Sequence, residues 1–305
     1  MLLARHPFRA MGSPCELHFY GESRGFCDGL VALAEGEVRR LEAKYSRYRD
    51  DSVTSAVNRS AGDPTGIAVD DETSGLLDYA ATAFASSQGL FDPTSGVLRR
   101  VWNFKSGRVP AQTEIDAILP LVGWSRLDWQ RPKLVLPHAA MQLDFGGFVK
   151  EYAADRAVEL CRARGARHGM VDLGGDLAVI GPHPDGKPWI VGIRDPRAPE
   201  GAMASVRLHA GGIATSGDYE RCMVVDGVRY THVLDPRTGW PVTGLRSVSV
   251  VADQCLIAGT ATTVAMLMGQ SDGARWLDEL GLPNLRMDVA GEISGTLASG
   301  QRVAA

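Results

Sequence analysis

A histidine stands immediately before a tight turn in the segment HVLDPRTGWP, residues 232–241. Imidazole titrates closest to neutral pH, so His232 could act as a general base. The preceding segment YERCMVVDGVRYTHVL places Asp226–Gly227 between two β-rich runs, which is typical of a type I′ hairpin. In that register Arg221 lies opposite His232 on the same face, and a neighbouring guanidinium favours the neutral imidazole that a base requires. A hydrogen-bonded strand histidine is the alternative interpretation.

A second segment that could do chemistry is LDFGGFVKEYAADRA, residues 143–157. A strand in MQLDF is expected to end at Asp144, followed by two glycines and a helix that begins near Phe148 and carries Lys150 in its first turn. The free N–H groups of a helix N-terminus bind anions together with a lysine, and glycines let a phosphate approach the backbone. A plain strand–turn–helix junction with a solvated lysine explains the segment equally well.

Three further segments combine turn residues with polar or aromatic side chains. VDLGGDLAVIG places Gly174 and Gly175 before Asp176, where a backbone could approach a phosphate or sugar and the turn would position the aspartate. YSRYRDDSVTSAVN offers Tyr48 as a platform for a planar ligand, and GLFDPTSG places Asp92 before a proline. Taken singly, each segment is equally or more typical of an ordinary turn or helix end.

The composition is that of an ordinary globular protein, with 45% hydrophobic and 22% charged residues among 305 and a formal net charge of −4. The slight acidity and the lack of a Lys/Arg block argue against a nucleic-acid partner. Five scattered cysteines without a CxxC pair indicate reduced thiols used as small apolar residues. The N-terminal segment has no secretory signal pattern and no run is long enough for a membrane span, so we expect a cytoplasmic protein.

Helices and strands occur without strict βαβ alternation, which favours an α+β fold with mixed, mainly antiparallel sheets and packed helices. Apolar periodicity and end signals predict helices at about 28–45, 69–87, 148–165, 256–268 and 272–280. Short β-rich runs predict strands in MQLDF, HGMVDL, LAVIG, WIVGI, ASVRLHA and SVSVVA. No linker, charge run or repeat divides the chain, so we expect a single domain over residues 1–305.

Several of these segments occur in an order that resembles one family. MGSPCELHFYG, YSRYRDDSVTSAVN, GLFDPTSGVLRRVWNF, LDFGGFVKEYAADRA, VDLGGDLAVIG, GIATSGDYER, YTHVLDPRTGWPV and IAGTATTVAMLMG together resemble the FAD:protein FMN transferases, the ApbE-like flavin transferases. The resemblance covers about residues 10–270. It implies an enzyme that cleaves FAD, attaches FMN through its phosphate to a Ser or Thr of a client protein, and releases AMP with the help of magnesium. It also implies an FAD cleft between two lobes.

The resemblance assigns roles residue by residue. The residues that look like FAD contacts are Met11, Tyr48, Phe91, Asp92, Asp144 and Lys150, with Val233 as a backbone contact. His232 looks like the general base. The backbone carbonyl of Gly147 and the hydroxyl of Thr263 look like magnesium ligands. We add Asp176 to the expected FAD-binding residues because its glycine turn would position it beside a phosphate or sugar.

Two positions depart from the family pattern. The family usually has an aspartate one helical turn before the metal-binding threonine, where this chain has Gly259, and commonly has glycine where this chain has Glu151. Magnesium prefers at least one protein carboxylate, so Gly147 and Thr263 alone should hold it weakly, and the sequence leaves open whether Glu151 compensates. Two alternatives therefore stay open, a non-catalytic flavin-binding or carrier protein and an FAD pyrophosphatase giving FMN and AMP. His232 favours an enzyme, because a carrier needs no base.

Overall fold

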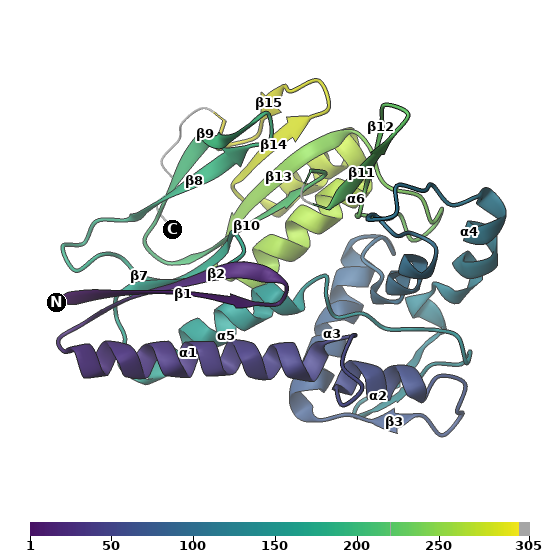
Figure 1. Ribbon diagram of the computed structural model, residues 1–305, viewed down its shortest axis with the longest axis horizontal. Helices are drawn as coiled ribbons and strands as arrows, with labels where there is room; N and C mark the ends of the chain where they lie inside the picture. The colour runs from purple at the N-terminus through teal and green to yellow at the C-terminus, as the bar shows by residue number, and fades with distance from the viewer. Residues whose placement is uncertain (220, 299–305) are drawn as a thin grey trace.

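The computed structural model describes residues 1–219 and 221–298 and is built on a large antiparallel sheet (Figure 1). Its strand order is β1-β2-β6-β7-β10-β13-β14-β15, and each neighbouring pair runs antiparallel. The strands span Leu2–Ala10 (β1), Ser13–Gly21 (β2), Gly169–Leu173 (β6), Asp176–Gly181 (β7), Gly211–Gly217 (β10), Leu245–Ala252 (β13), Asn284–Asp288 (β14) and Ile293–Ser294 (β15).

Helices cover one face of this sheet and a two-stranded ribbon covers the other (Figure 1). The helices are α1 (Arg24–Tyr45), α5 (Val149–Ala163) and α6 (Cys255–Leu280), and the ribbon consists of β8 (Trp189–Asp195) and β9 (Ala198–Leu208). Successive side chains of a strand point to opposite faces. In β7, Ala178 accordingly packs in the cluster beneath α1 and α5, whereas Leu177 packs against the ribbon.

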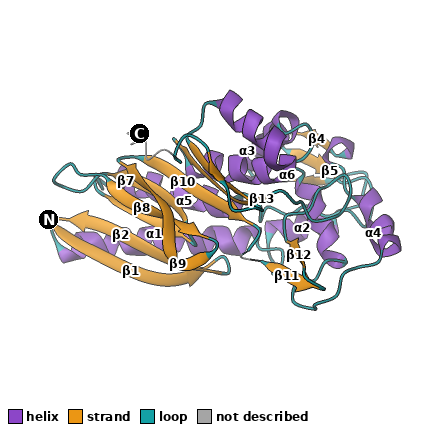
Figure 2. Cartoon of the chain, turned by 90° about the horizontal axis from the view of Figure 1, so that it is seen from above, coloured by secondary structure: helices purple, strands orange, loops and turns teal. Residues whose placement is uncertain are grey.

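The chain between α1 and α5 forms a second, mainly helical group beside the sheet (Figure 2). Its elements are α2 (Val53–Arg59), β3 (Ile67–Ala68), α3 (Asp71–Ser86), α4 (Gln112–Ile118), β4 (Asp128–Gln130), β5 (Lys133–Val135) and three 3-10 turns, Pro93–Arg100, Leu119–Leu121 and Trp124–Arg126. Leu77 of α3 and Leu134 of β5 belong to the same hydrophobic cluster as Leu30 of α1. A continuous core therefore joins the helical group to the helices under the sheet.

The hairpin expected from the Asp-Gly pair is present as β11 (Cys222–Val225) and β12 (Val228–Thr231). The Asp226–Gly227 turn has φ values of 51° and 78°, as a type I′ turn requires, and the strand register is the expected one. The hairpin lies near α4 (Figure 1), and its Met223 packs in one hydrophobic cluster with Trp102. It therefore rests on the helical group.

The structure confirms the α+β class and corrects one local prediction. The helices expected at 256–268 and 272–280 are both present within α6, which is kinked between them at the non-helical Gly269, where φ is 81°. The MQLDF segment is an extended loop, so the prediction of a strand ending at Asp144 is wrong. The reason is that the Asn58 side chain takes both backbone groups of Leu143, accepting from its N–H at 2.7 Å and donating to its carbonyl at 3.0 Å.

The described residues contain no helix that combines the length and apolarity needed to cross a membrane. The five cysteines all carry free thiols. Four are buried and Cys222 is half-buried, as expected for cysteines used as small apolar residues.

Candidate active site

His232 directly follows β12, and one carbonyl group fixes both its backbone and its ring. Its N–H donates to the Arg221 carbonyl at 3.0 Å, and its Nδ1 lies 3.1 Å from the same oxygen. Because a carbonyl can only accept, Nδ1 carries the hydrogen of the neutral ring and Nε2 is the acceptor. The pKa of His232 is lowered to about 4, mainly by burial and then by the charges of Arg221 and Arg99. The imidazole is therefore neutral at physiological pH, as a general base must be.

The tight turn after His232 anchors the strand end that carries it. Trp102 Nε1 donates to the Gly239 carbonyl at 2.7 Å. Gly239 has a φ of 73°, and a Cβ at this position would lie 2.6 Å from Ile115 Cγ2. A side chain would thus face both an unfavourable backbone conformation and a steric clash. The glycine of the Asp-Pro-x-Thr-Gly turn is required for close packing on the helical group.

Asp144 pairs with two arginines and bonds the glycine pair before α5. Its Oδ2 accepts from Arg47 Nη1 at 2.7 Å and lies 3.8 Å from Arg99 Nε, while its Oδ1 accepts from the Gly146 N–H at 2.9 Å. Arg99 also contributes to the lowered pKa of His232. Asp144 thus pairs with two arginines that come from distant parts of the sequence, and the charge of one of them, Arg99, also reaches His232.

Lys150 lies in the first turn of α5, and its ammonium group is in contact with the carboxylate of Asp176. It also donates to the Leu173 carbonyl at 3.3 Å and lies 3.5 Å from Glu151 Oε1. Burial alone would lower the pKa of Lys150, but the charges of Asp176 and Glu151 outweigh burial and raise it. Lys150 is thus a fixed positive charge at the helix N-terminus, which differs from the solvated lysine of the alternative interpretation.

Asp176 begins β7 directly after the Gly174–Gly175 turn. The two glycines have φ values of 71° and 93°, so the segment is a tight hairpin turn. Asp176 is buried, and its Oδ1 accepts from the Thr215 N–H at 3.0 Å while its other oxygen contacts Lys150. The aspartate therefore positions the lysine, and its expected contact with FAD stays a prediction.

Glu151 follows Lys150 and points its carboxyl group into the interface between α5 and α6. Its pKa is raised to about 8, mainly by burial; Lys150 opposes this rise and Asp176 adds to it. Its Oε2 is buried and has no hydrogen-bond partner among the described residues. A Cβ at Gly259 would lie 2.5 Å from Glu151 Cγ, so the two positions that depart from the family pattern meet in space.

The oxygen atoms expected to bind magnesium come from α6 and from the glycine pair before α5. Thr263 follows Gly259 by one helical turn of α6, and its Oγ1 lies 3.4 Å from Ser216 Oγ. The expected ligands are hard oxygen atoms from a hydroxyl and from the Gly147 carbonyl. Within residues 1–219 and 221–298, no group of three or more His, Cys, Asp or Glu side chains could hold a metal ion. Carbonyl, hydroxyl and carboxyl oxygens are the kind of ligand that magnesium takes in proteins.

Met11 and Tyr48, two expected FAD contacts, lie at turns close to this region. Met11 occupies the β1–β2 turn with a φ of 52°, and its N–H donates to Glu42. A Cβ at Gly12 would lie 3.9 Å from Arg221 Nη2, which places this turn beside the histidine hairpin. Tyr48 is 83% exposed, so its ring is accessible to a planar ligand. Both contacts with FAD stay predictions.

Phe91, Asp92 and Val233 are more enclosed. Phe91 is buried in the main hydrophobic cluster. Asp92 accepts from the Thr94 N–H at 2.7 Å and from the Trp124 N–H at 2.9 Å, which is the role of a turn starter. Val233 is half-buried against the cluster that packs on α6. A ligand contact of Phe91 or Asp92 stays a prediction, and these bonds show that Asp92 also stabilises its own turn.

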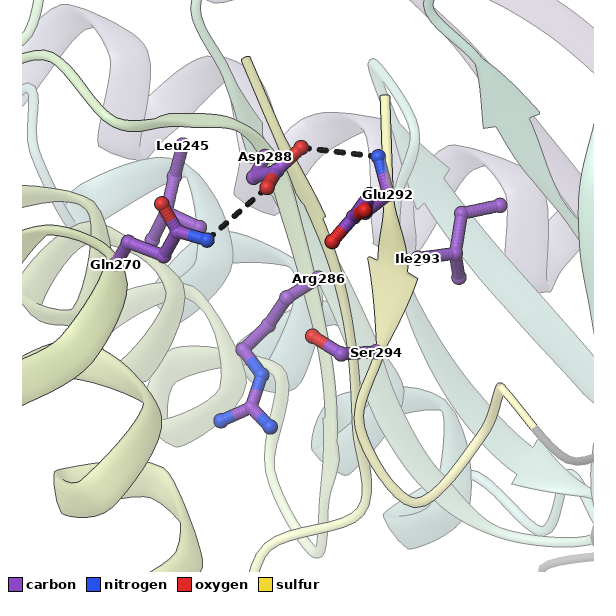
Figure 3. A pocket seen from close by; sticks show the side chains of 7 residues that line it. All are labelled: Leu245, Gln270, Arg286, Asp288, Glu292, Ile293 and Ser294. Atoms are coloured by element: carbon purple, nitrogen blue, oxygen red, sulfur yellow. Dashed lines mark hydrogen bonds between the residues drawn. The ribbon is translucent and has the colours of Figure 1, made fainter. Parts of the chain in front are cut away.

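A separate pocket of about 140 Å³ lies beside β14 and β15 (Figure 3). Its lining residues are Leu245, Gln270, Arg286, Asp288, Glu292, Ile293 and Ser294. Asp288 accepts from Gln270 Nε2 at 3.0 Å and from the Glu292 N–H at 2.9 Å, as the dashed lines show. None of the expected site residues lines this pocket, so it is not part of the candidate active site.

The chain is similar to known proteins over most of its length. Residues 11–285 match the model of the ApbE family. The chain belongs to this family. An FAD:protein FMN transferase of Chlamydia pneumoniae is 32% identical over 250 residues, covering 79% of this chain and 77% of that protein. The ApbE protein of Thermotoga maritima has a similar structure, with a TM-score of 0.88, 29% identity and coverage of 98% of both chains.

A third ApbE-family relative, an FAD:protein FMN transferase of Rhodobacter capsulatus, is 28% identical over 286 residues. The match covers 90% of this chain and 53% of that protein, so the chain spans about half the length of this relative. The relatives named here by activity are transferases, so the chain is a member of a family of transferase enzymes.

Sequence reasoning missed two residues of this ApbE-family site, Arg47 and Arg99. Both lie inside segments that carry the resemblance, one next to Tyr48 and one in GVLRR. Arg47 could have been selected as the cation beside an exposed aromatic ring at a helix end. No local signal distinguishes Arg99 from its neighbour Arg100, because its partners lie far away in the sequence.

Proposed function

We propose that this chain cleaves FAD and transfers FMN, through its phosphate, to a serine or threonine hydroxyl of a client protein, releasing AMP with the help of magnesium. The geometry of His232 carries the proposal, because its Nδ1 lies 3.1 Å from the Arg221 carbonyl and Nε2 is left as the acceptor that a general base needs. A neutral base and an anion-binding segment are the two parts that displacement at phosphorus by a hydroxyl requires. The names of the ApbE-family relatives support the same activity.

In this proposal His232 is the general base. Its Nε2 accepts the proton of the client hydroxyl as the hydroxyl oxygen attacks the FMN phosphorus. The bond that forms joins this phosphorus to the client oxygen. The bond that breaks joins the phosphorus to the bridging oxygen of the pyrophosphate, and AMP leaves with that oxygen. The Nδ1–H bond to the Arg221 carbonyl holds the ring in the tautomer that this step needs.

The segment between Asp144 and Lys150 binds the phosphates. The N-terminus of α5 has no side-chain cap, although the N–H groups of Phe148 and Val149 donate to the Phe145 carbonyl, and Lys150 adds a positive charge held there by Asp176. The Gly147 carbonyl and the Thr263 hydroxyl are expected magnesium ligands. Magnesium, when bound, would neutralise charge on the pyrophosphate oxygens. The fixed charge of Lys150 favours the transition state because it needs no reorganisation during the reaction.

Incubation with FAD and Mg²⁺, followed by measurement of AMP, tests the proposal. We expect AMP release that increases when an acceptor protein with an accessible threonine is added, together with flavin fluorescence that remains on the acceptor after denaturing electrophoresis. AMP and free FMN in equal amounts, without labelled acceptor, would show the pyrophosphatase activity instead. FAD binding without AMP would indicate a carrier and would overturn the proposal.

Replacing Tyr48 by alanine should weaken FAD binding by about tenfold. Stacking of a base on an aromatic ring contributes roughly 1–3 kcal/mol, and each 1.4 kcal/mol corresponds to about tenfold in affinity. Because Tyr48 is 83% exposed, the free energy of unfolding should change by less than about 0.5 kcal/mol. Flavin fluorescence titration measures the affinity, and Tyr48→Phe, which keeps the ring, is the matched control. Equal affinity of the alanine and phenylalanine variants would remove Tyr48 from the FAD site.

Replacing Arg221 by glutamine should move the acid limb of the pH–rate profile to higher pH. Loss of a neighbouring positive charge raises the pKa of His232, and the base is lost when pH falls below that pKa. The shift should be small because Arg221 is exposed and its charge is screened by solvent. Arg229→Gln, on the same hairpin, is the control and should leave the profile unchanged. A shift to lower pH in Arg221→Gln would contradict the assignment of the limb to His232.

A further inference from the structure

The Glu151 side chain of α5 occupies the space that a side chain at position 259 of α6 would need. A Cβ added to Gly259 would lie 2.5 Å from Glu151 Cγ, 3.0 Å from Cδ and 3.2 Å from Oε1. Packed protein interiors do not accommodate contacts this short, so any side chain at position 259 must displace the glutamate. The lack of a side chain at Gly259 is therefore what allows Glu151 to lie against α6.

The Glu151 carboxyl group lacks a full set of partners. The residue is 8% exposed, and its Oε2 has no hydrogen-bond partner within the part of the chain that the structure describes. Its Oε1 lies 3.5 Å from Lys150 Nζ, but this ammonium group is already in contact with Asp176. Two buried carboxyl groups thus share one ammonium group. A buried carboxylate in this position needs a further cation or a proton.

Neutral oxygen donors are available on the same side of α6. Thr263 lies one helical turn after Gly259 and therefore on the same face of the helix. Its hydroxyl is 3.4 Å from that of Ser216 on β10. Carboxylate and hydroxyl oxygens are the hard ligands that magnesium and manganese prefer. The donor chemistry points to a divalent cation, which would take the place of a proton on Glu151.

We propose that Glu151 is the protein carboxylate that binds the divalent cation of this site, and that Gly259 is required because it makes room for Glu151. The role of this cation in the reaction rests on the proposed function, whereas the binding of the cation does not. The carboxylate comes from α5, in place of the α6 aspartate that the family pattern leads one to expect. Glu151 and Gly259 then form a reciprocal pair.

Because Gly259 makes room for Glu151, an aspartate at position 259 should not improve the site. Gly259→Asp alone places a side chain on top of Glu151 and brings a third carboxyl group next to Asp176 and Glu151. It should weaken cation binding. The double exchange Glu151→Gly with Gly259→Asp removes the clash and keeps one carboxylate, now on α6. It should bind the cation nearly as well as the wild-type protein.

Mn²⁺ binding to FAD-free protein, measured by the EPR signal of free Mn²⁺ with and without ADP, tests the proposal. Loss of a group that merely supports a metal ligand lowers affinity about 10–100-fold, and loss of a ligand should cost at least as much. We therefore expect Glu151→Gln to weaken Mn²⁺ binding at least about tenfold. Gly259→Asp should also weaken it, and the double exchange should return it to within about threefold of wild type. Glu159→Gln removes an exposed carboxylate from the same helix and should have no effect.

Three results would overturn the proposal: unchanged binding in Glu151→Gln, tighter binding in Gly259→Asp, or no binding by the wild-type protein at millimolar Mn²⁺ even with ADP. Thermal unfolding of each variant checks that the fold is kept, and the double exchange distinguishes loss of a ligand from general disruption. The measurement needs neither FAD turnover nor a client. A protein that binds Mn²⁺ through Glu151 but releases no AMP would refute the proposed function and leave this inference intact.

Discussion

Replacing His232 by alanine should slow AMP release from FAD about 10²–10⁴-fold while FAD affinity changes little, because a positioned general base contributes this much to rate and does not hold the substrate. The structure favours such a role in two ways. The Arg221 carbonyl fixes the Nδ1–H tautomer. Burial and the charges of two arginines lower the pKa of the ring to about 4, so the ring is neutral above that pH. Single-turnover measurement of AMP with saturating FAD separates the rate from the affinity.

The controls for this prediction use the same chemistry. His138→Ala removes an exposed histidine elsewhere and should leave AMP release unchanged. Added imidazole should restore part of the rate of His232→Ala, because a free imidazole can enter the space of the missing ring. A merely structural histidine would not be rescued in this way. Normal turnover by His232→Ala would show that this residue is an ordinary hydrogen-bonded strand histidine.

Replacing Lys150 by methionine should lower the free energy of unfolding by about 3 kcal/mol. Removing one partner of a buried ion pair costs about 3–5 kcal/mol, and the lower end applies because the Lys150 side chain is 24% exposed. The loss arises from the carboxyl groups of Asp176 and Glu151, which would remain buried without a cation. Urea unfolding measures the change through a lower midpoint at constant slope.

Two companion variants make the prediction specific. Lys150→Met combined with Asp176→Asn should regain part of the stability, because one of the unpaired carboxyl groups is removed while its Thr215 bond can be kept. Lys187→Met breaks an exposed pair with Asp185 and should cost less than about 1 kcal/mol. Similar decreases in the free energy of unfolding for Lys150→Met and Lys187→Met would contradict the conclusion that Lys150 and Asp176 form a buried ion pair.

The features that the sequence predicts well depend on local rules. The Asp226–Gly227 turn needs two positive φ values, so its residues specify both the hairpin and the register that brings Arg221 to His232. The helices follow from apolar periodicity, and the break at Gly269 corresponds to the gap between two predicted helices. The prediction of a strand before Asp144 is wrong because the Asn58 side chain makes the hydrogen bonds that a neighbouring strand would otherwise make.

The parts of the site that the sequence leaves open depend on contacts between distant residues. A missing carboxylate at Gly259 and an additional one at Glu151 are visible in the sequence, but their contact depends on how α5 and α6 cross. Asp144 is expected as a ligand contact, yet its bonds to Arg47 and Arg99 require the packing of the helical group. Pattern and family resemblance thus predict the residues, and the tertiary structure determines which of them interact.

The hairpin that carries His232 rests on Trp102 and Ile115, in a cluster distinct from the one that contains Phe148 and Val149 beside Lys150. Small clusters at the edge of a protein open at lower free energy than its main core. Opening of the smaller cluster would withdraw His232, the proposed base, while the proposed phosphate-binding segment stays folded. Mild warming or a low urea concentration would then stop turnover under conditions in which the protein still binds the flavin nucleotide. We therefore expect loss of activity to report partial unfolding earlier than loss of bound flavin does. A sample that is saturated with flavin nucleotide can then be inactive.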